Sequence, residues 1–222
     1  MTAGMTTASE IAREGTLRAA RRETARTALL NATAEILSEA TQIEASLSEI
    51  SRRSGVNSAM IKYYFGDKQG LLMALLEREA EREMSGLDAL VAMDVSAERK
   101  MTIHVEGIVN AYYRSPYLNR LVHYMVEAGG PEASARVSDM FITPMMAAYR
   151  QIVAQGVREG TMVDVDPALL YYALVGAADH IFFAAYSVPT TLGVAKVDVG
   201  IKQAYATLLR DLFLRGLRPG KD

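Results

Sequence analysis

Apolar residues recur every three or four positions along most of the chain, which is the spacing of a helix with one buried face. The first such stripe lies between residues 18 and 38 and consists of Ala25, Leu29, Ala32, Thr33, Ile36 and Leu37. No stretch shows the strict apolar–polar alternation of a half-buried strand. The pattern therefore predicts an all-α fold.

Further helical stripes follow, separated by glycine and proline. We expect them over residues 68–85, 100–114, 117–128, 132–159, 168–187 and 197–217. Ser115-Pro116 and Gly129-Gly130-Pro131 are predicted breaks, because proline removes a helical N–H and glycine favours a turn. Pro144 is expected to kink its helix, and Pro167 fits the first turn of the next one. The segment 168–187 is apolar almost all round, as a helix buried on two sides should be.

Residues 46–68, SLSEISRRSGVNSAMIKYYFGDK, predict two short helices joined by a tight turn. Gly55 permits the left-handed backbone that such a turn needs. Asn57 and Ser58 can cap the second helix, which we expect from Ser58 to Tyr64, and Asp67 can cap a third. Two short helices with a glycine-containing turn form a helix-turn-helix, whose second helix enters a DNA major groove.

The distribution of charge agrees with a DNA-binding N-terminal part. The whole chain carries 24 Lys and Arg against 26 Asp and Glu, a net charge of −2. Residues 11–70 hold nine basic and seven acidic residues, or +2, which leaves −4 for the remainder. A basic excess next to the helix-turn-helix has the sign expected for contact with phosphate. Arg18, Arg21, Arg22 and Arg26 precede it as a basic arm.

Composition limits where the protein acts. Its 222 residues suit one domain, or a small domain plus a larger one. The absence of cysteine excludes a disulfide framework and fits a reducing compartment. The first residues, MTAGMTTASE, do not resemble a secretory signal, and no apolar run approaches the roughly 18–20 residues of a membrane span. We expect a cytoplasmic, nucleoid-associated protein with no membrane partner.

Motifs for catalysis are missing from the sequence. Its three histidines lie far apart, with no His-x-x-x-His or His-Glu-x-x-His pair to seat a metal. Gly129-Gly130 ends a helix and does not follow a strand, so it is not a dinucleotide-binding loop. No serine lies in a Gly-x-Ser-x-Gly turn. The chain is therefore not expected to be an enzyme, and no catalytic residue, metal or cofactor is predicted.

The helix-turn-helix stretch resembles the N-terminal signature of TetR-family transcriptional repressors. The resemblance rests on Gly55-Val56-Asn57-Ser58-Ala59, Ile61 to Lys68 and Leu71-Leu72, and extends from Arg26 to about Leu76. Lys62 stands where an aromatic residue is usual, and Tyr64 where histidine is commonest. Both departures lie on the recognition helix, so they bear on which operator is read.

The resemblance, together with the helix pattern, implies three parts: a flexible arm over residues 1–18, a helix-turn-helix domain over 19–70, and an effector-binding and dimerisation domain over 71–222. Side chains at the start of the recognition helix reach base edges, and those further along reach phosphates. The predicted DNA-binding residues are Arg22, Ser46, Asn57, Ser58, Ala59, Met60, Lys62, Tyr63, Tyr64 and Lys68.

One head covers too few base pairs for useful specificity, so a homodimer on a palindromic operator is expected. The last two helices are the candidates for its interface, because their apolar faces exceed what one partner helix covers, and pairing with a second copy would give a four-helix bundle. The alternative is that both are core helices of a monomer. The predicted interface residues are Leu170, Leu174, Ile181, Tyr205, Leu208, Leu209, Leu212 and Phe213.

Methionine, tyrosine and histidine are frequent in the middle helices and can line an adaptable pocket for a largely apolar molecule. Ordinary core packing is the alternative, and the family resemblance favours the pocket. The predicted effector-binding residues are His104, Tyr112, His123, Tyr124, Met125, Phe141, Met145, Tyr149, Tyr172, His180 and Phe183.

These observations predict a one-component transcriptional regulator, a repressor that an unknown small, largely apolar effector releases from double-stranded operator DNA. Two alternatives remain open at this point. One is a helical ligand-binding or interaction protein with a degenerate DNA-binding head. The other is a regulator whose ligand strengthens DNA binding.

Overall fold

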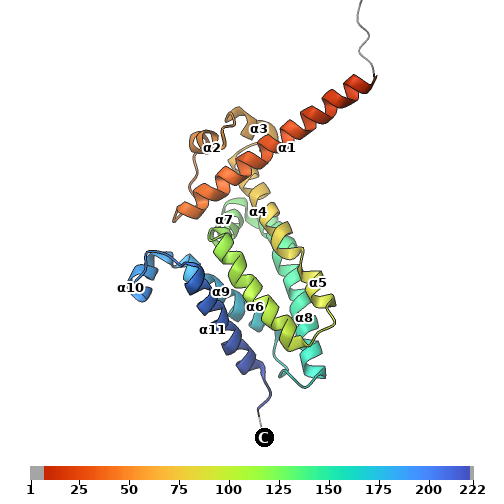
Figure 1. Cartoon of the computed structure of the whole chain (residues 1–222), viewed down its shortest axis with the longest axis vertical. Helices are drawn as coiled ribbons and strands as arrows, with labels where there is room; N and C mark the ends of the chain where they lie inside the picture. Colours follow the sequence, from red (N-terminus) through yellow and green to blue (C-terminus); the bar gives the residue numbers. More distant parts are fainter. Residues whose placement is uncertain (1–7, 221–222) are drawn as a thin grey trace, which may run out of the picture. The chain divides into compact units, whose positions relative to one another are not determined.

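A computed structural model describes residues 8–220, and it confirms the all-α fold: no strand occurs among these residues. The helices are shown along the chain in Figure 1. Their bounds are α1 Ala8–Glu39, α2 Leu47–Ser54, α3 Ala59–Phe65, α4 Lys68–Met84, α5 Leu87–Ala92, α6 Ala97–Arg114, α7 Leu118–Val137, α8 Thr143–Arg158, α9 Pro167–Phe183, α10 Val188–Leu192 and α11 Val199–Leu217. A π-helical turn, Ser138–Ile142, precedes α8, and a 3₁₀ turn, Ala185–Ser187, precedes α10.

The chain divides into two compact units between Leu75 and Leu76, a boundary that falls within α4. We call residues 1–75 the head and residues 76–222 the regulatory unit. The sequence had placed this boundary at residue 70. The predicted flexible arm, residues 1–18, is wrong from Ala8 onward, because α1 begins there; residues 1–7 lie outside the described residues. Alanine, glutamate and arginine dominate the start of α1, and these residues favour a helix.

The head buries a small core between α1, α2, α3 and the start of α4. Leu29, Leu37, Ile50, Ile61 and Leu71 are almost completely buried. The join between α3 and α4 is very tight at Gly70, where a Cβ atom would lie 1.9 Å from the carbonyl oxygen of Phe65. Only glycine fits at this position without a shift of the backbone.

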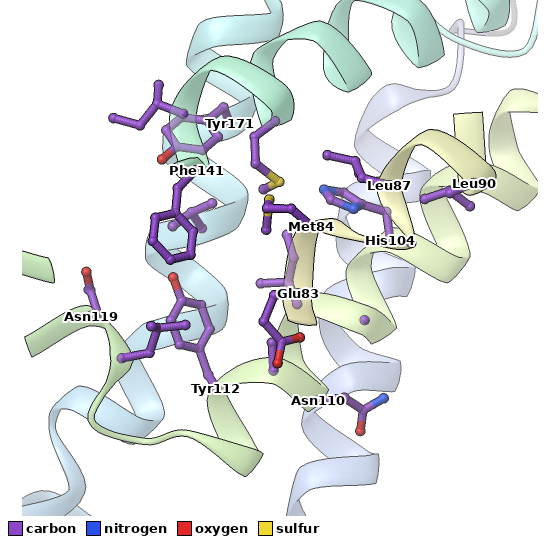
Figure 2. A pocket seen from close by; sticks show the side chains of 18 of the residues that line it. Glu83, Met84, Leu87, Leu90, His104, Asn110, Tyr112, Asn119, Phe141 and Tyr171 are labelled. Carbon is purple, nitrogen blue, oxygen red and sulfur yellow. The ribbon is translucent and has the colours of Figure 1, made fainter. Parts of the chain in front are cut away.

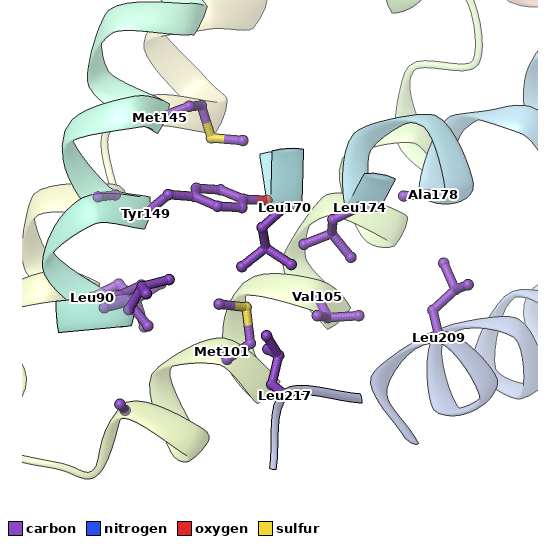
Figure 3. Packing of buried hydrophobic residues seen from close by; sticks show 14 of the residues in the cluster. Leu90, Met101, Val105, Met145, Tyr149, Leu170, Leu174, Ala178, Leu209 and Leu217 are labelled. Carbon is purple, nitrogen blue, oxygen red and sulfur yellow. The ribbon is translucent and has the colours of Figure 1, made fainter. Parts of the chain in front are cut away.

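The regulatory unit has its core between α5, α6, α8, α9 and α11, and α6 packs most extensively against α11. Figure 3 shows Met101, Val105, Leu174 and Leu209 meeting in this core. Gly130 has φ 61° and ψ −149°, so it kinks α7 where the sequence predicted that the helix stops. Pro144 lies in the first turn of α8, directly after the π-helical turn, where its missing N–H costs little.

The segment expected as one helix over residues 168–187 is shorter in the structure. α9 ends at Phe183, a 3₁₀ turn follows over Ala185–Ser187, and residues 188–192, for which no helix was expected, form the short helix α10. Within residues 8–220, no single helix has the length and apolarity to span a membrane; the bent pair of α9 and residues 185–192 passes that test by length and composition only.

Candidate nucleic-acid interface and ligand cavity

Hydrogen bonds between near neighbours in the sequence hold the helix-turn-helix together. The Ser46 hydroxyl accepts from the Glu49 N–H at 3.1 Å and caps α2. Gly55 ends α2 with φ 69°, the left-handed conformation that the sequence predicted. The Ser51 hydroxyl then donates to the Val56 carbonyl at 2.7 Å. The direction of the turn is thus set by local contacts.

Side-chain caps hold the start of α3, the predicted recognition helix, and the start of α4. The Asn57 Oδ1 atom accepts from the Ala59 N–H at 2.8 Å, while Ser58 makes no capping bond through its side chain. Asp67 Oδ1 accepts from the Gly70 N–H at 2.8 Å at the start of α4. Asn57 and Asp67 therefore cap their helices as predicted, whereas the cap predicted from the Ser58 side chain is not formed.

Most of the predicted DNA-binding side chains lie on the surface of the head. Tyr63 is 59% exposed. The set is completed by the exposed residues Arg22, Ser46, Asn57, Ser58, Ala59 and Lys62 and by the half-buried residues Met60, Tyr64 and Lys68. Ile61 faces the core from the same helix, so the exposed residues share the opposite side of α3.

Two arginines of α1 stack on aromatic rings at the end of α3. The Arg22 guanidinium lies 5.7 Å from the centre of the Tyr63 ring, and the Arg26 guanidinium lies 5.5 Å from the centre of the Phe65 ring. Such cation–π contacts attract through the quadrupole of the ring. Of the predicted basic arm, Arg22 and Arg26 thus lie beside the recognition helix; the side chains of Arg18 and Arg21 are outside the described part of the chain.

A cavity of about 390 Å³ lies within the regulatory unit, with walls from α4, α5, α6, α7, the π-helical turn, α8 and α9. Figure 2 shows Phe141, Tyr171 and Tyr112 on one side of it and Met84, Leu87 and His104 on the other. Its volume is near the lower end of the roughly 300–1,000 Å³ range of small-molecule pockets. Mainly apolar side chains form the wall, so the cavity suits an apolar molecule.

His104 is the most unusual polar group in the cavity wall. Burial lowers the pKa of its imidazole to about 4, so the ring is neutral at pH 7. Its Nε2 atom is buried and finds no hydrogen-bond partner among the described residues. The ring contacts Tyr149 edge-on, with ring centres 5.0 Å apart. The phenol oxygen of Tyr149 is also buried without a partner.

The ionised side chains in the wall are paired. Glu83 Oε2 accepts from Arg114 at 2.6 Å, and Glu83 Oε1 accepts from Arg82 Nε at 2.9 Å. Asn110 and Asn119 contribute neutral amides. Burial raises the pKa of the Tyr112 phenol, so that group is uncharged at neutral pH as well. The cavity therefore offers no unpaired charge to a ligand.

The predicted effector residues are only partly brought together. His104, Tyr112, Phe141 and Met145 line the cavity. Tyr149 and Met125 are buried outside its lining, and Tyr124 is half-buried away from it. The exposed residues His123, Tyr172, His180 and Phe183 do not line it either, and Tyr172 is 70% exposed. Sequence reasoning missed Glu83 and Asn119, since neither shows a local signal that distinguishes it from a surface residue.

A buried polar cluster ties the end of α4 to the corner between α6 and α7. The Glu79 carboxylate is inaccessible to solvent; it accepts from the Ser115 hydroxyl at 2.9 Å and from the Tyr117 hydroxyl at 3.0 Å. Arg82 bonds the same carboxylate and the Ser115 hydroxyl. Because Glu83 and Met84 of α4 line the cavity, this cluster is next to it along the helix.

Apolar side chains are exposed on α9 and α11. Leu208 is 53% and Leu212 58% exposed, and Leu169, Tyr172 and Phe183 are exposed on α9. Of the predicted interface residues, Leu208 and Leu212 are thus exposed, while Ile181, Tyr205 and Phe213 are half-buried. Leu170, Leu174 and Leu209 are buried in the core of the regulatory unit, where a partner chain would not reach them. No group of three or more His, Asp or Glu in the described residues could hold a metal ion.

Comparison with known proteins gives one consistent result. A family model described as the C-terminal domain of tetracyclin-repressor-like proteins matches residues 94–221. The HTH-type transcriptional regulator BetI of Escherichia coli O17:K52:H18 is 35% identical over 81 residues, which are 36% of this chain and 42% of that protein. The chain thus spans between a quarter and about two fifths of the length of the curated relatives that it matches.

Solved structures share the fold over most of the chain. A TetR/AcrR-family regulator from Thermobifida fusca has a TM-score of 0.65 and 21% identity, covering 87% of this chain and 98% of that one. FadR from Bacillus subtilis, solved in complex with stearoyl-CoA, has a TM-score of 0.63 and 14% identity, covering 88% and 99%. At these identities the likeness is one of fold.

Proposed function

Because the chain belongs to the TetR family of transcriptional regulators, we propose that it is a homodimeric repressor that a small, largely apolar ligand releases from a palindromic operator. Family membership agrees with the resemblance of the helix-turn-helix stretch. It also confirms that the chain is not an enzyme, since TetR-family members are transcription factors. The repressor would act in the cytoplasm on chromosomal DNA.

The observation that carries the proposal is the exposed side of α3. Lys62 and Tyr63 are exposed there, next to the guanidinium of Arg22, while Ile61 fixes the helix to the core of the head. A cationic and hydroxyl-bearing helix face of this size fits a major groove, where ammonium groups donate to guanine acceptors and hydroxyls reach phosphates.

A second copy of the chain is the proposed occupant of the exposed apolar face on α9 and α11. Leu169, Tyr172, Leu208 and Leu212 would be covered by the same residues of the partner, as two-fold symmetry requires. Two recognition helices about 34–36 Å apart would then enter successive major grooves on one side of the duplex. The buried residues Leu170, Leu174 and Leu209 would support this surface from beneath.

Release would act through α4, which begins with residues of the head and ends with residues of the regulatory unit. Glu83 and Met84 at its end line the cavity, and Glu79 ties it to the α6–α7 corner. A ligand that favours another position of α4 changes the spacing of the recognition helices. It weakens operator binding by its differential affinity for the two states, typically about 1–3 kcal/mol.

Selection of bound sequences from random duplex DNA is the first experiment, because the operator is unknown. We expect a near-palindrome, with affinity that falls steeply as salt rises. Lys62→Ala should reduce operator binding by at least about tenfold, the effect of one lost base or phosphate contact. Lys196→Ala, a matched change of an exposed lysine in the regulatory unit, should leave binding unchanged. Failure to enrich any duplex at low salt would refute the DNA-binding role.

Dimerisation is tested separately on the α9–α11 face. Leu212→Arg places a charge in the proposed interface and should turn the dimer into a monomer by analytical ultracentrifugation. Val163→Arg adds the same charge at another exposed apolar position of the regulatory unit and should not. A wild-type chain that sediments as a monomer at micromolar concentration contradicts the proposal.

The ligand response is tested with the selected operator. Titration of apolar small molecules into the complex should release DNA, and Ile108→Ala in the cavity wall should raise the concentration needed. The stearoyl-CoA bound by FadR belongs to that protein, and the fold likeness alone does not assign it here. A ligand that tightens DNA binding would contradict the proposal that the ligand releases the operator.

A further inference from the structure

The cavity described above also indicates the chemistry of its ligand, on the premise that it is the effector site. The starting point is His104, which is buried in the cavity wall and whose Nε2 atom has no partner among the described residues. A buried polar atom without a hydrogen bond is costly, and most such atoms in proteins are paired. The His104 ring lines the cavity, but its Nε2 atom has almost no accessible surface in the ligand-free protein, so a ligand supplies the missing partner once the ring turns this nitrogen toward the cavity.

The charged side chains in the cavity wall indicate whether the ligand is charged. Glu83 and Arg114 are the ionised side chains among the lining residues, and they bond each other at 2.6 Å. A carboxylate or phosphate ligand would meet no free cation, and an ammonium ligand would meet no free anion. Either would lose its hydration without compensation, which costs several kcal/mol for an ion in an apolar site. An uncharged ligand avoids this cost.

The neutral imidazole of His104 indicates which polar group the ligand carries. In the neutral ring one nitrogen donates and the other accepts, so Nε2 has one role or the other, and a group that can both donate and accept pairs with it in either tautomer. A hydroxyl does both and satisfies either tautomer. An ether or ester oxygen only accepts, and a hydrocarbon does neither. The uncharged phenol of Tyr112, from the same helix, adds a second neutral polar point to the cavity, as Figure 2 shows.

We propose that the cavity selects an uncharged, mainly apolar alcohol whose hydroxyl hydrogen-bonds the imidazole of His104. In this arrangement the apolar body lies against Leu87, Ile108, Val122 and Met145. The hydroxyl satisfies a nitrogen that the protein leaves unpaired. His104 is thus a specificity-determining residue. Its unpaired nitrogen lowers the stability of the ligand-free protein, and the ligand restores the missing hydrogen bond.

The test uses the full-length protein and four probes of similar length that differ in one end. These are 1-decanol, 1-methoxynonane, decanoate and decyltrimethylammonium, with dissociation constants from displacement of Nile red. With the ring proton on Nδ1, Nε2 accepts and only 1-decanol can donate to it, so we expect 1-decanol to bind about tenfold more tightly than 1-methoxynonane, the effect of one net hydrogen bond. Decanoate and decyltrimethylammonium should bind more weakly still. Equal or tighter binding of either ion, or no binding of 1-decanol, overturns the inference.

Variants assign the selectivity to His104. His104→Phe keeps the aromatic contact with Tyr149 and removes both nitrogens, so the preference for 1-decanol over 1-methoxynonane should disappear. Val122→Ala shortens an apolar wall residue and should weaken both probes while preserving their ratio. The empty His104→Phe protein should also melt at a higher temperature than the wild type, because the unpaired nitrogen is gone. A lower melting temperature together with an unchanged ratio would mark His104 as a packing residue only.

Operator binding, measured in parallel, separates this inference from the proposed function. If 1-decanol binds with the expected selectivity but leaves the operator complex intact, the ligand chemistry stands and the release mechanism fails. If decanoate binds and releases the operator while 1-decanol does neither, the release mechanism stands and the ligand chemistry fails.

Discussion

The head and the regulatory unit build their candidate sites in opposite ways. In the head, the side chains that would meet DNA come from residues 46–68, with Arg22 added from α1, and the caps that orient them bond residues two to five positions apart. In the regulatory unit, the cavity takes its wall from residues as far apart as Glu83 and Val175. A local site depends on the backbone of one stretch, whereas a dispersed site depends on burial by many helices.

This difference determines which substitutions damage each unit. In the head, the sensitive positions should be those where the backbone turns or approaches itself. In the regulatory unit they should be buried polar side chains, whose partners come from other helices. The following predictions test that contrast, from the largest expected effect to the smallest.

Gly70→Ala should have the largest effect. The new Cβ atom would lie 1.9 Å from the Phe65 carbonyl oxygen, so α3 or α4 must move. We expect a loss of more than about 3 kcal/mol of stability in the head, the upper range for overpacking. The loss would be measured as faster amide exchange in α2 and α3. At Gly216 of α11 the added Cβ meets no atom within 4 Å, so Gly216→Ala should leave stability equal or slightly higher. Equal effects of the two changes would contradict this account of the α3–α4 join.

His104 should make the regulatory unit sensitive to acid. Its pKa is about 4 in the folded protein, below the ordinary value of 6.5, because burial disfavours the charged form. As pH falls from about 6.5 to about 4, His104 binds a proton in the unfolded chain but stays neutral in the folded protein. Stability should therefore decline over this range by up to about 3 kcal/mol.

Melting temperatures of wild type and His104→Phe between about pH 8 and about pH 3 measure this effect. The difference between the two proteins should widen below pH 6.5 and stop changing below about pH 4. His180→Phe, at an exposed position, serves as the control and should follow the wild type. A constant difference across the range would show that His104 takes up a proton in the folded protein as readily as in the unfolded chain.

Lys100→Met should destabilise the regulatory unit by an intermediate amount. The buried Lys100 ammonium donates to the Val91 carbonyl at 2.6 Å and to Gln155 Oε1 at 2.8 Å. Methionine fills much of the same volume but leaves both oxygens without this donor, which costs about 2 kcal/mol. Urea titration would measure it. Arg99→Met, one position earlier and exposed, should change stability by less than about 0.5 kcal/mol.

Ser46→Ala should have the smallest effect, about 1 kcal/mol, because it removes one N-cap bond to the Glu49 N–H. Local amide exchange in α2 is the measurement. Ser46→Asp restores an acceptor at the cap and should recover the protection. Recovery of operator binding is not expected, since the added charge would face phosphate.

The contrast also explains what the sequence could and could not predict. The caps at Ser46, Asn57 and Asp67 and the turn at Gly55 were predictable, because their chemistry involves residues a few positions apart. The start of α1 was not, since residues 1–18 were interpreted as a flexible arm although the alanine, glutamate and arginine residues from Ala8 onward favour a helix.

The cavity and the α9–α11 face were less predictable for a different reason. α9 is apolar almost all round, so its periodicity does not tell which side meets the core. Leu170 and Leu174 point inward, whereas Leu169 and Tyr172, one or two positions away, are exposed. The same ambiguity placed Tyr172 and Phe183 in the predicted pocket. Glu83 on α4 and Asn119 on α7 were left out because nothing in their local sequence distinguishes them from surface residues. Such assignments need the positions of the neighbouring helices.

The stacking of Arg22 on Tyr63 and of Arg26 on Phe65 has an evolutionary consequence. These contacts anchor the last turn of α3, whereas neither contact involves Ala59 or Lys62, which lie nearer its start. If α3 reads the operator as proposed, mutations at those two positions would change the preferred DNA sequence without loosening the helix. Operator preference could then drift among descendants of this chain while their architecture stays constant.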